Sequence, residues 1–154
     1  MKRILISSLL LLITSMCTAQ VLVNLRIDMN GKYDDMDEVD LKARDYEWSV
    51  TWDDVTKPAI YQDVLKCLNK HEKDKEFGNF PKTRYELVIS GIEMDEDGET
   101  TATVTLTDTR SGEVLFSHEY QKDGDETKDF TRITSKSLKA IASAAAKKLN
   151  KITL

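Results

Sequence analysis

A run of acidic residues near the start of the chain has the composition of a calcium-binding loop. Residues 28–40 read DMNGKYDDMDEVD, and closely spaced carboxylates are ligands that Ca²⁺ prefers. An EF-hand loop needs oxygen ligands at positions one, three and five, glycine at six and glutamate at twelve. Counting from Asp28 puts Lys32 at position five, and counting from Asp35 puts Val39 there. Because both frames fail, we predict an acidic connector between two strands, in which calcium binding is at most weak and adventitious.

One cysteine and one histidine are spaced so that their side chains could meet. Cys67 and His71 lie four residues apart in a predicted helix, which places them on one face. A thiol beside a base can become a nucleophile. Cys67 also borders the apolar stripe of the helix, and a single cysteine in that position more often packs as a small apolar residue. We therefore expect a structural cysteine.

Each histidine is followed by a glutamate, in the pairs His71-Glu72 and His118-Glu119. The zinc-protease motif needs a second histidine four residues after the first. Lysines occupy both of those positions. The motif is absent, and His118 is expected to pack in a strand or at its rim. We expect no catalytic residue, no cofactor and no metal ligand.

Three aromatic side chains are the remaining interaction candidates. Tyr46, Trp48 and Trp52 alternate with polar residues, which is typical of one face of a strand. Such a face could stack against a sugar ring, and this gives the alternative function of a carbohydrate-binding accessory domain. Aromatic residues at this spacing more often belong to a core.

The first 19 residues have the pattern of a cleaved secretory signal. Lys2 and Arg3 precede an apolar run over 4–13, and small residues lead to predicted cleavage after Ala19. The apolar run is too short to span a bilayer, which needs about 20 residues. We expect a periplasmic or secreted protein.

Removal of the signal leaves 20 basic and 27 acidic residues, a net charge of −7. An acidic surface disfavours nucleic acid and anionic lipid as partners. Contact with a membrane is expected only if Cys17 were lipidated, and the large Met16 before it disfavours that modification. The mature chain keeps Cys67 alone, so an internal disulfide is excluded.

The elements that would position these residues follow from hydrophobic periodicity. Alternation predicts strands over 21–29 and 46–52. Thr56 is a candidate N-cap for a helix that fades in the charged run 71–76 and stops by Gly78. Strands over 85–94, 100–108 and 114–120, joined by tight turns, predict an antiparallel meander with one covered face. Apolar spacing predicts a helix in the last thirty residues.

This order predicts one α+β domain over 20–154, a two-layer sandwich whose mixed or antiparallel sheet of about five strands carries two helices on one face.

The second half of the chain resembles a known family. Residues 85–150 contain YELVISGIEM, TATVTLTDTRSGEVLFS and an Ala-rich helix. This order is similar to the domain shared by the curli-secretion lipoprotein and the TolB amino-terminal region, in which a strand ends near a glycine such as Gly91. A later hairpin in that family carries an Asp and then Thr or Ser with Gly, as in Asp108 to Gly112. The resemblance implies a bacterial envelope location and function through protein contacts. We therefore expect a non-enzymatic interaction or assembly module whose partner is an envelope protein or glycan.

Overall fold

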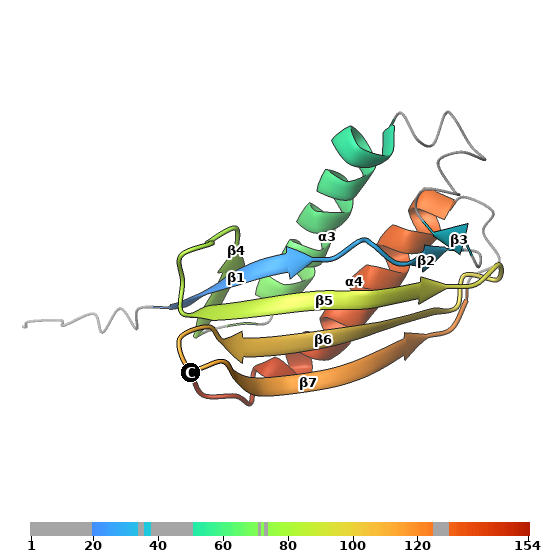
Figure 1. The fold of residues 1–154 in the computed structure, drawn as a ribbon. Helices are drawn as coiled ribbons and strands as arrows, with labels where there is room; N and C mark the ends of the chain where they lie inside the picture. Colours follow the sequence, from blue (N-terminus) through green and yellow to red (C-terminus); the bar gives the residue numbers. More distant parts are fainter. Residues whose placement is uncertain (1–19, 34–35, 38–50, 71, 73, 125–129) are drawn as a thin grey trace, which may run out of the picture.

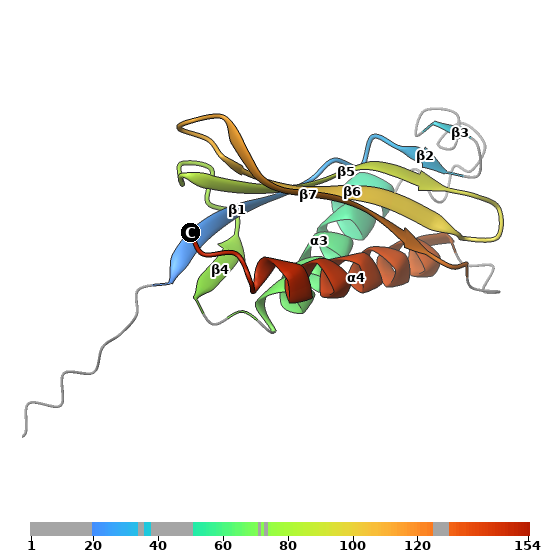
Figure 2. The same ribbon diagram turned by 90° about the horizontal axis from the view of Figure 1, so that it is seen from below.

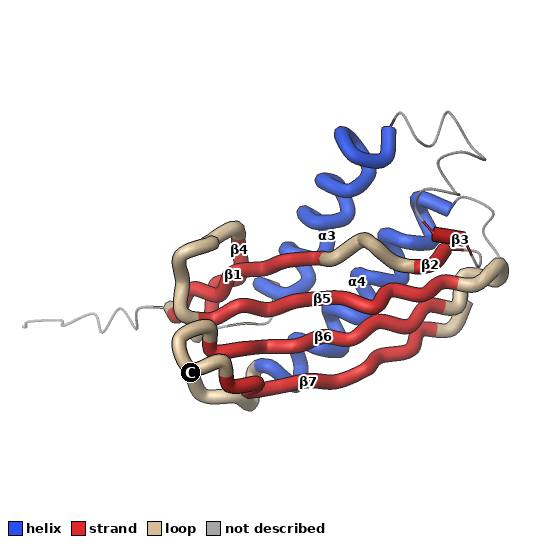
Figure 3. Tube along the Cα trace, viewed as in Figure 1, coloured by secondary structure: helices blue, strands red, loops and turns tan. Residues whose placement is uncertain are grey.

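The computed structural model describes residues 20–33, 36–37, 51–70, 72, 74–124 and 130–154. In this part of the chain a mixed sheet forms one layer, and two helices cover a single face of it (Figures 1 and 2). Coloured by secondary structure, the helices lie together behind the strands (Figure 3). The predicted two-layer α+β sandwich with both helices on one face is confirmed.

The sheet is built around one central strand. Strand β5 (Tyr85–Met94) pairs in parallel with β1 (Val21–Ile27) and antiparallel with β6 (Thr100–Asp108). Strand β7 (Glu113–Lys122) pairs with β6 and forms one edge, and β4 (Lys75–Gly78) pairs with β1 at the other. Two short strands, β2 (Lys32–Tyr33) and β3 (Met36–Asp37), form a hairpin, and β2 adds to the far end of β5. The predicted meander is therefore present as β5, β6 and β7.

Strand β6 shows why the sheet has one covered face. Ala102, Val104 and Leu106 are buried, while the threonines between them are half-exposed. This alternation matches the expected two-residue period of a strand between a core and solvent. The threonine face carries no helix (Figure 2).

Gly91 lies within β5, three residues before its end at Met94. The family resemblance implied a strand that ends near this glycine. The register of β5 against β6 shifts between Ser90 and Glu93, and Gly91 has a φ of 60°. The extra residue of this β-bulge reverses the facing of the side chains, so that buried positions change from Leu87 and Ile89 to Ile92 and Met94. The strand continues to Met94 with its apolar side still toward the helices.

The last two residues of the charged run after the first helix begin a strand, which corrects the predicted helix fading over 71–76. Helix α3 (Lys57–Asn69) ends earlier, and β4 follows at Lys75. Asn69 secures this strand, because its side-chain amide donates to the carbonyl of Phe77 at 2.9 Å and accepts from the N–H of Phe77 at 2.8 Å. Phe77 is buried and joins the core.

The end of the predicted strand over 46–52 is helical. A π-helical turn, η1 (Trp52–Thr56), leads directly into α3. Thr56 makes no side-chain capping hydrogen bond, so its predicted N-cap role is wrong: the helical backbone has already begun at Trp52. Residues 46–50 lie outside the described residues.

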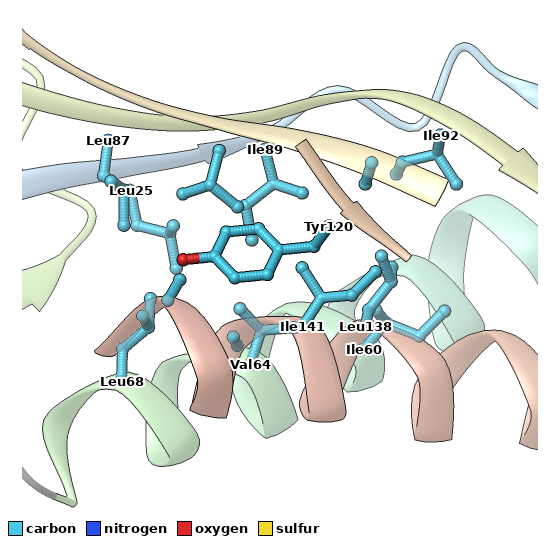
Figure 4. Packing of buried hydrophobic residues seen from close by; sticks show 14 of the residues in the cluster. Leu25, Ile60, Val64, Leu68, Leu87, Ile89, Ile92, Tyr120, Leu138 and Ile141 are labelled. Atoms are coloured by element: carbon cyan, nitrogen blue, oxygen red, sulfur yellow. The ribbon is translucent and has the colours of Figure 1, made fainter. Parts of the chain in front are cut away.

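Helix α4 (Phe130–Leu149) closes the core against the sheet. Its buried residues are Ile133, Thr134, Ser137, Leu138, Ile141, Ala142, Ala145, Ala146 and Leu149. Small alanines let the helix axis approach the strands, while Leu138 and Ile141 fill the space between α4, α3 and the sheet (Figure 4). The predicted carboxyl-terminal helix and its apolar stripe are confirmed.

Candidate functional site: the outer face of helix α4

Helix α4 has an unusual charge composition for an acidic protein. Over its 20 residues it carries cations and no acidic residue: Arg132, Lys136, Lys139, Lys147 and Lys148. Residues three, four, seven or eight apart lie on one side of a helix. Arg132, Lys136, Lys139 and Lys147 therefore share one side, which we name the cationic stripe. At a rise of about 1.5 Å per residue the stripe is about 22 Å long.

The cationic stripe faces away from the core. Arg132, Lys136 and Lys147 are exposed and Lys139 is half-exposed, whereas the opposite side of the helix is buried against the sheet. In Figure 2, α4 lies in the layer of helices below the sheet. The stripe is consequently presented to solvent on a rigid element, at the side of the domain that is farthest from the strands.

A groove of about 480 Å³ runs beside the stripe, between α3 and α4. Its lining comes from both helices and comprises Thr56, Ala59, Ile60, Asp63, Arg132, Ser135, Lys136 and Lys139. Asp63 accepts a hydrogen bond from the Ser135 hydroxyl at 3.0 Å, and its carboxylate lies 3.6 Å from the Lys139 ammonium. Asp63 is the single acidic residue in this lining against three cations, so the groove is net positive.

This chemistry suits recognition of an anion by charge and hydrogen bonding. Guanidinium and ammonium groups bind carboxylates and phosphates, and the Ser135 and Thr56 hydroxyls add hydrogen-bonding capacity. Within the described ranges, no group of three or more His, Cys, Asp or Glu side chains could hold a metal ion. The geometry therefore offers a contact surface for a negatively charged partner.

Of the three aromatic candidates, the structure describes only Trp52. Its side chain is fully buried, and its ring packs edge-on against Tyr33 with 5.9 Å between ring centroids. The Lys57 ammonium lies 5.7 Å from the ring of Trp52. Trp52 is thus a core residue with no face open to a sugar. Tyr46 and Trp48 lie outside the described residues.

The structure describes Cys67 but not His71, the histidine that could meet its thiol. Cys67 is half-buried and packs against the hydrophobic core, and His71 lies outside the described residues. Farther along the chain, the Glu72 carboxylate and the Lys75 ammonium are both buried, 3.7 Å apart. Burial raises the pKa of Glu72, and Lys75 opposes that shift. Both side chains are buried, so this ion pair lies in the interior of the described structure.

The acidic connector shows local hydrogen bonding at its beginning. The N–H of Asn30 donates to the Asp28 carboxylate at 3.1 Å, which is a tight turn closed by the aspartate side chain. Much of the remaining connector lies outside the described residues, and weak calcium binding there stays a prediction.

His118 lies at the rim of the sheet, on the helix side of edge strand β7. The ammonium of Lys148 lies 2.8 Å from Nε2 of His118. The His118 ring packs edge-on against the ring of Tyr120, with 4.6 Å between the ring centroids. Burial raises the pKa of the Tyr120 hydroxyl. His118 is therefore held between Lys148 and Tyr120, as a residue at the rim of the sheet.

The cationic stripe cannot be predicted from the net charge of the whole chain, which sums over all of its surfaces. The signal is nonetheless present, since residues 131–154 contain lysines at helical spacing and no acidic residue. In the part of the chain that the structure describes, no helix combines the length and apolar character needed to cross a bilayer.

No protein-family model matches the chain, and no curated protein matches it in sequence. Among solved structures, it is similar to a Xanthomonas campestris protein of family DUF330, with a TM-score of 0.50 and 8% identity over 85% of this chain and 83% of the other. It also matches a PelC dodecamer variant from Paraburkholderia phytofirmans (TM-score 0.45, 14% identity, 82% and 87% covered). A third match is a homolog of a neuraminyllactose-binding hemagglutinin from Helicobacter pylori (TM-score 0.44, 11% identity, 87% and 85% covered). At these identities the first similarity establishes the two-layer fold alone, and the specific resemblance to the curli and TolB domains stays a prediction.

Proposed function

We propose that this protein is an exported, non-enzymatic component of a bacterial envelope that binds a negatively charged macromolecule through the outer face of α4. The export part of the proposal rests on the secretory pattern of residues 1–19. The observation that carries the binding part is the cationic stripe, four cations on the solvent side of a helix without a single acidic residue.

Like charges on one face of a helix repel one another and lower the stability of the helix. Cations four residues apart repel one another and destabilise an isolated helix by a few tenths of a kcal/mol per pair. In a chain whose acids outnumber its bases, interspersed charges would remove this repulsion. Asp63 compensates for part of this repulsion at Lys139, and a contact with an acidic surface would compensate for more of it.

Charge reversal on the stripe tests the proposal. Lys136→Glu with Lys147→Glu changes two exposed positions on the stripe, and Lys82→Glu with Arg110→Glu applies the same charge change to exposed loop residues elsewhere. Tagged forms of the exported protein are crosslinked mildly in envelope extract and purified. We expect a crosslinked partner with the wild type and the loop control and its loss with the stripe variant. Equal capture by all three proteins would contradict the proposal.

A further inference from the structure

A second charged surface of the same chain is complementary to the cationic stripe. The turn between β5 and β6, together with the strand ends that it joins, carries the acidic residues Glu93, Asp95, Glu96, Asp97 and Glu99. All five are exposed. This group, named the acidic hairpin, has no basic residue within it and gives one end of the sheet a strongly negative tip.

The acidic hairpin is held in a defined shape. The Asp95 carboxylate accepts hydrogen bonds from the N–H groups of Asp97 and Glu99, at 3.0 and 2.8 Å. Glu99 accepts from the Gln121 side chain at 2.6 Å. Within the described part of the chain, the side chains of Glu96 and Asp97 have no ion-pair partner. Two carboxylates are therefore presented at the tip of a preformed turn.

The acidic hairpin of one molecule does not reach the cationic stripe of the same molecule. The β5–β6 connection extends the sheet layer at its end, while α4 lies beneath the sheet (Figures 1 and 2). The cationic stripe is on the side of α4 opposite to its buried, sheet-facing residues. A hairpin that continues the sheet layer cannot fold back around the helix to reach that side.

We infer that the anionic partner is a second copy of this chain, whose acidic hairpin docks on the cationic stripe beside the groove between α3 and α4. This inference rests on the proposed function and names its partner. Both complementary surfaces are present on every copy, so each molecule can give a hairpin to one neighbour and accept one from another. Such a head-to-tail contact produces a ring if the rotation closes and an open chain if it does not.

The contact is expected to be weak and sensitive to salt. Exposed ion pairs each contribute little, and ions screen them over about 10 Å at 0.1 M and about 3 Å at 1 M. The groove of about 480 Å³ has room for side chains of the incoming turn, with the Ser135 and Thr56 hydroxyls on its wall.

A pair of complementary charge reversals tests the inference with the purified exported protein. The stripe variant is Lys136→Glu with Lys147→Glu, and the hairpin variant is Glu96→Lys with Asp97→Lys. Asp95 is left intact because its carboxylate shapes the turn. Controls with the same charge changes are Lys82→Glu with Arg110→Glu, and Glu76→Lys with Glu113→Lys, all at exposed positions. Thermal melts confirm that each variant is folded.

Analytical ultracentrifugation at low salt measures the association. We expect the wild type and both controls to self-associate, with association lost at high salt, and each reversal alone to weaken it by about tenfold or more. Mixing the stripe and hairpin variants should restore association, because each then offers the charge that the other lacks. A wild type that stays monomeric at low salt, or a mixture that fails to recover, would overturn the inference. If envelope capture still depends on the stripe in that case, the proposed function stands and the partner is another acidic macromolecule.

Discussion

Arg84 and Asp108 join the beginning of β5 to the end of β6. The Arg84 Nε donates to the Asp108 carboxylate at 2.8 Å, and Asp108 is almost fully buried. The other carboxylate oxygen accepts the N–H of Arg110 at 3.0 Å, and the N–H of Gly112 donates to the carbonyl of Asp108 at 2.8 Å. One aspartate therefore fixes both the strand ends and the turn into β7. The hydrogen bond from Arg84 is the largest cause that lowers the pKa of Asp108.

Replacing Asp108 with asparagine should lower the melting temperature at pH 7 by several degrees, because the amide cannot form a charge-assisted bond with Arg84. The lowered pKa sets the pH dependence. A carboxyl whose pKa is lower in the folded state stabilises the protein above its unfolded pKa of about 3.9, and this contribution is lost as pH falls through the folded value. Thermal melts between pH 7 and pH 2 should show that the difference in melting temperature between the variant and the wild type becomes smaller in acid. The exposed Asp123→Asn is the control, and a difference independent of pH would contradict this role.

The packing of α4 against the sheet should dominate the stability of the domain. Ile141 is only 2% exposed and points into the cluster between the layers (Figure 4). Ile141→Ala keeps a strong helix former, so the loss reports packing, and we expect about 2–5 kcal/mol less free energy of unfolding. Val114→Ala removes methyl groups from a side chain that is 56% exposed and should change stability by less than about 0.5 kcal/mol. Urea unfolding measures both, and similar effects would refute the arrangement of the core.

Trp52 should behave as a buried fluorophore. In a Trp48→Phe variant, Trp52 is the only tryptophan. Its full burial against Tyr33 predicts blue emission that acrylamide quenches poorly. Red emission that is readily quenched would show that the ring is open to solvent and would revive the carbohydrate-binding alternative.

The parts of the fold that the sequence predicted are those in which burial repeats over many residues. The alternation of Ala102, Val104 and Leu106 with threonines, and the stripe of Leu138, Ile141 and Leu149, both report a long element with one buried side. Their period follows from strand and helix geometry alone, so no knowledge of neighbours was needed.

Short elements and local exceptions were not predictable in that way. Strand β4 has four residues and lies in a charged run, and it is a strand because β1 and the Asn69 side chain supply its hydrogen bonds. Trp52 suits a strand by type, but tertiary packing against Tyr33 holds it in a helical turn. The bulge at Gly91 changes which side chains of β5 point toward the core. A strict two-residue period does not predict such a change within one strand.

The candidate site was missed for a different reason. A net charge sums over the surface, whereas binding depends on where charges gather. Lys136 and Lys147 belong to the solvent side of one helix, and Glu96 and Asp97 belong to the turn between β5 and β6. The two kinds of charge therefore lie on different elements, which the net charge of the chain does not show.

The outer face of α4 is the proposed binding site of the partner. A photocrosslinking amino acid placed at Ser143, between Lys139 and Lys147 on that side of the helix, tests it in living cells. The same probe at Ser117, exposed on strand β7, is the matched control. We expect light-dependent adducts from position 143, of twice the chain mass if the partner is a second copy, and little from position 117. Adducts from position 117 alone, or equal yields from both positions, would contradict the account.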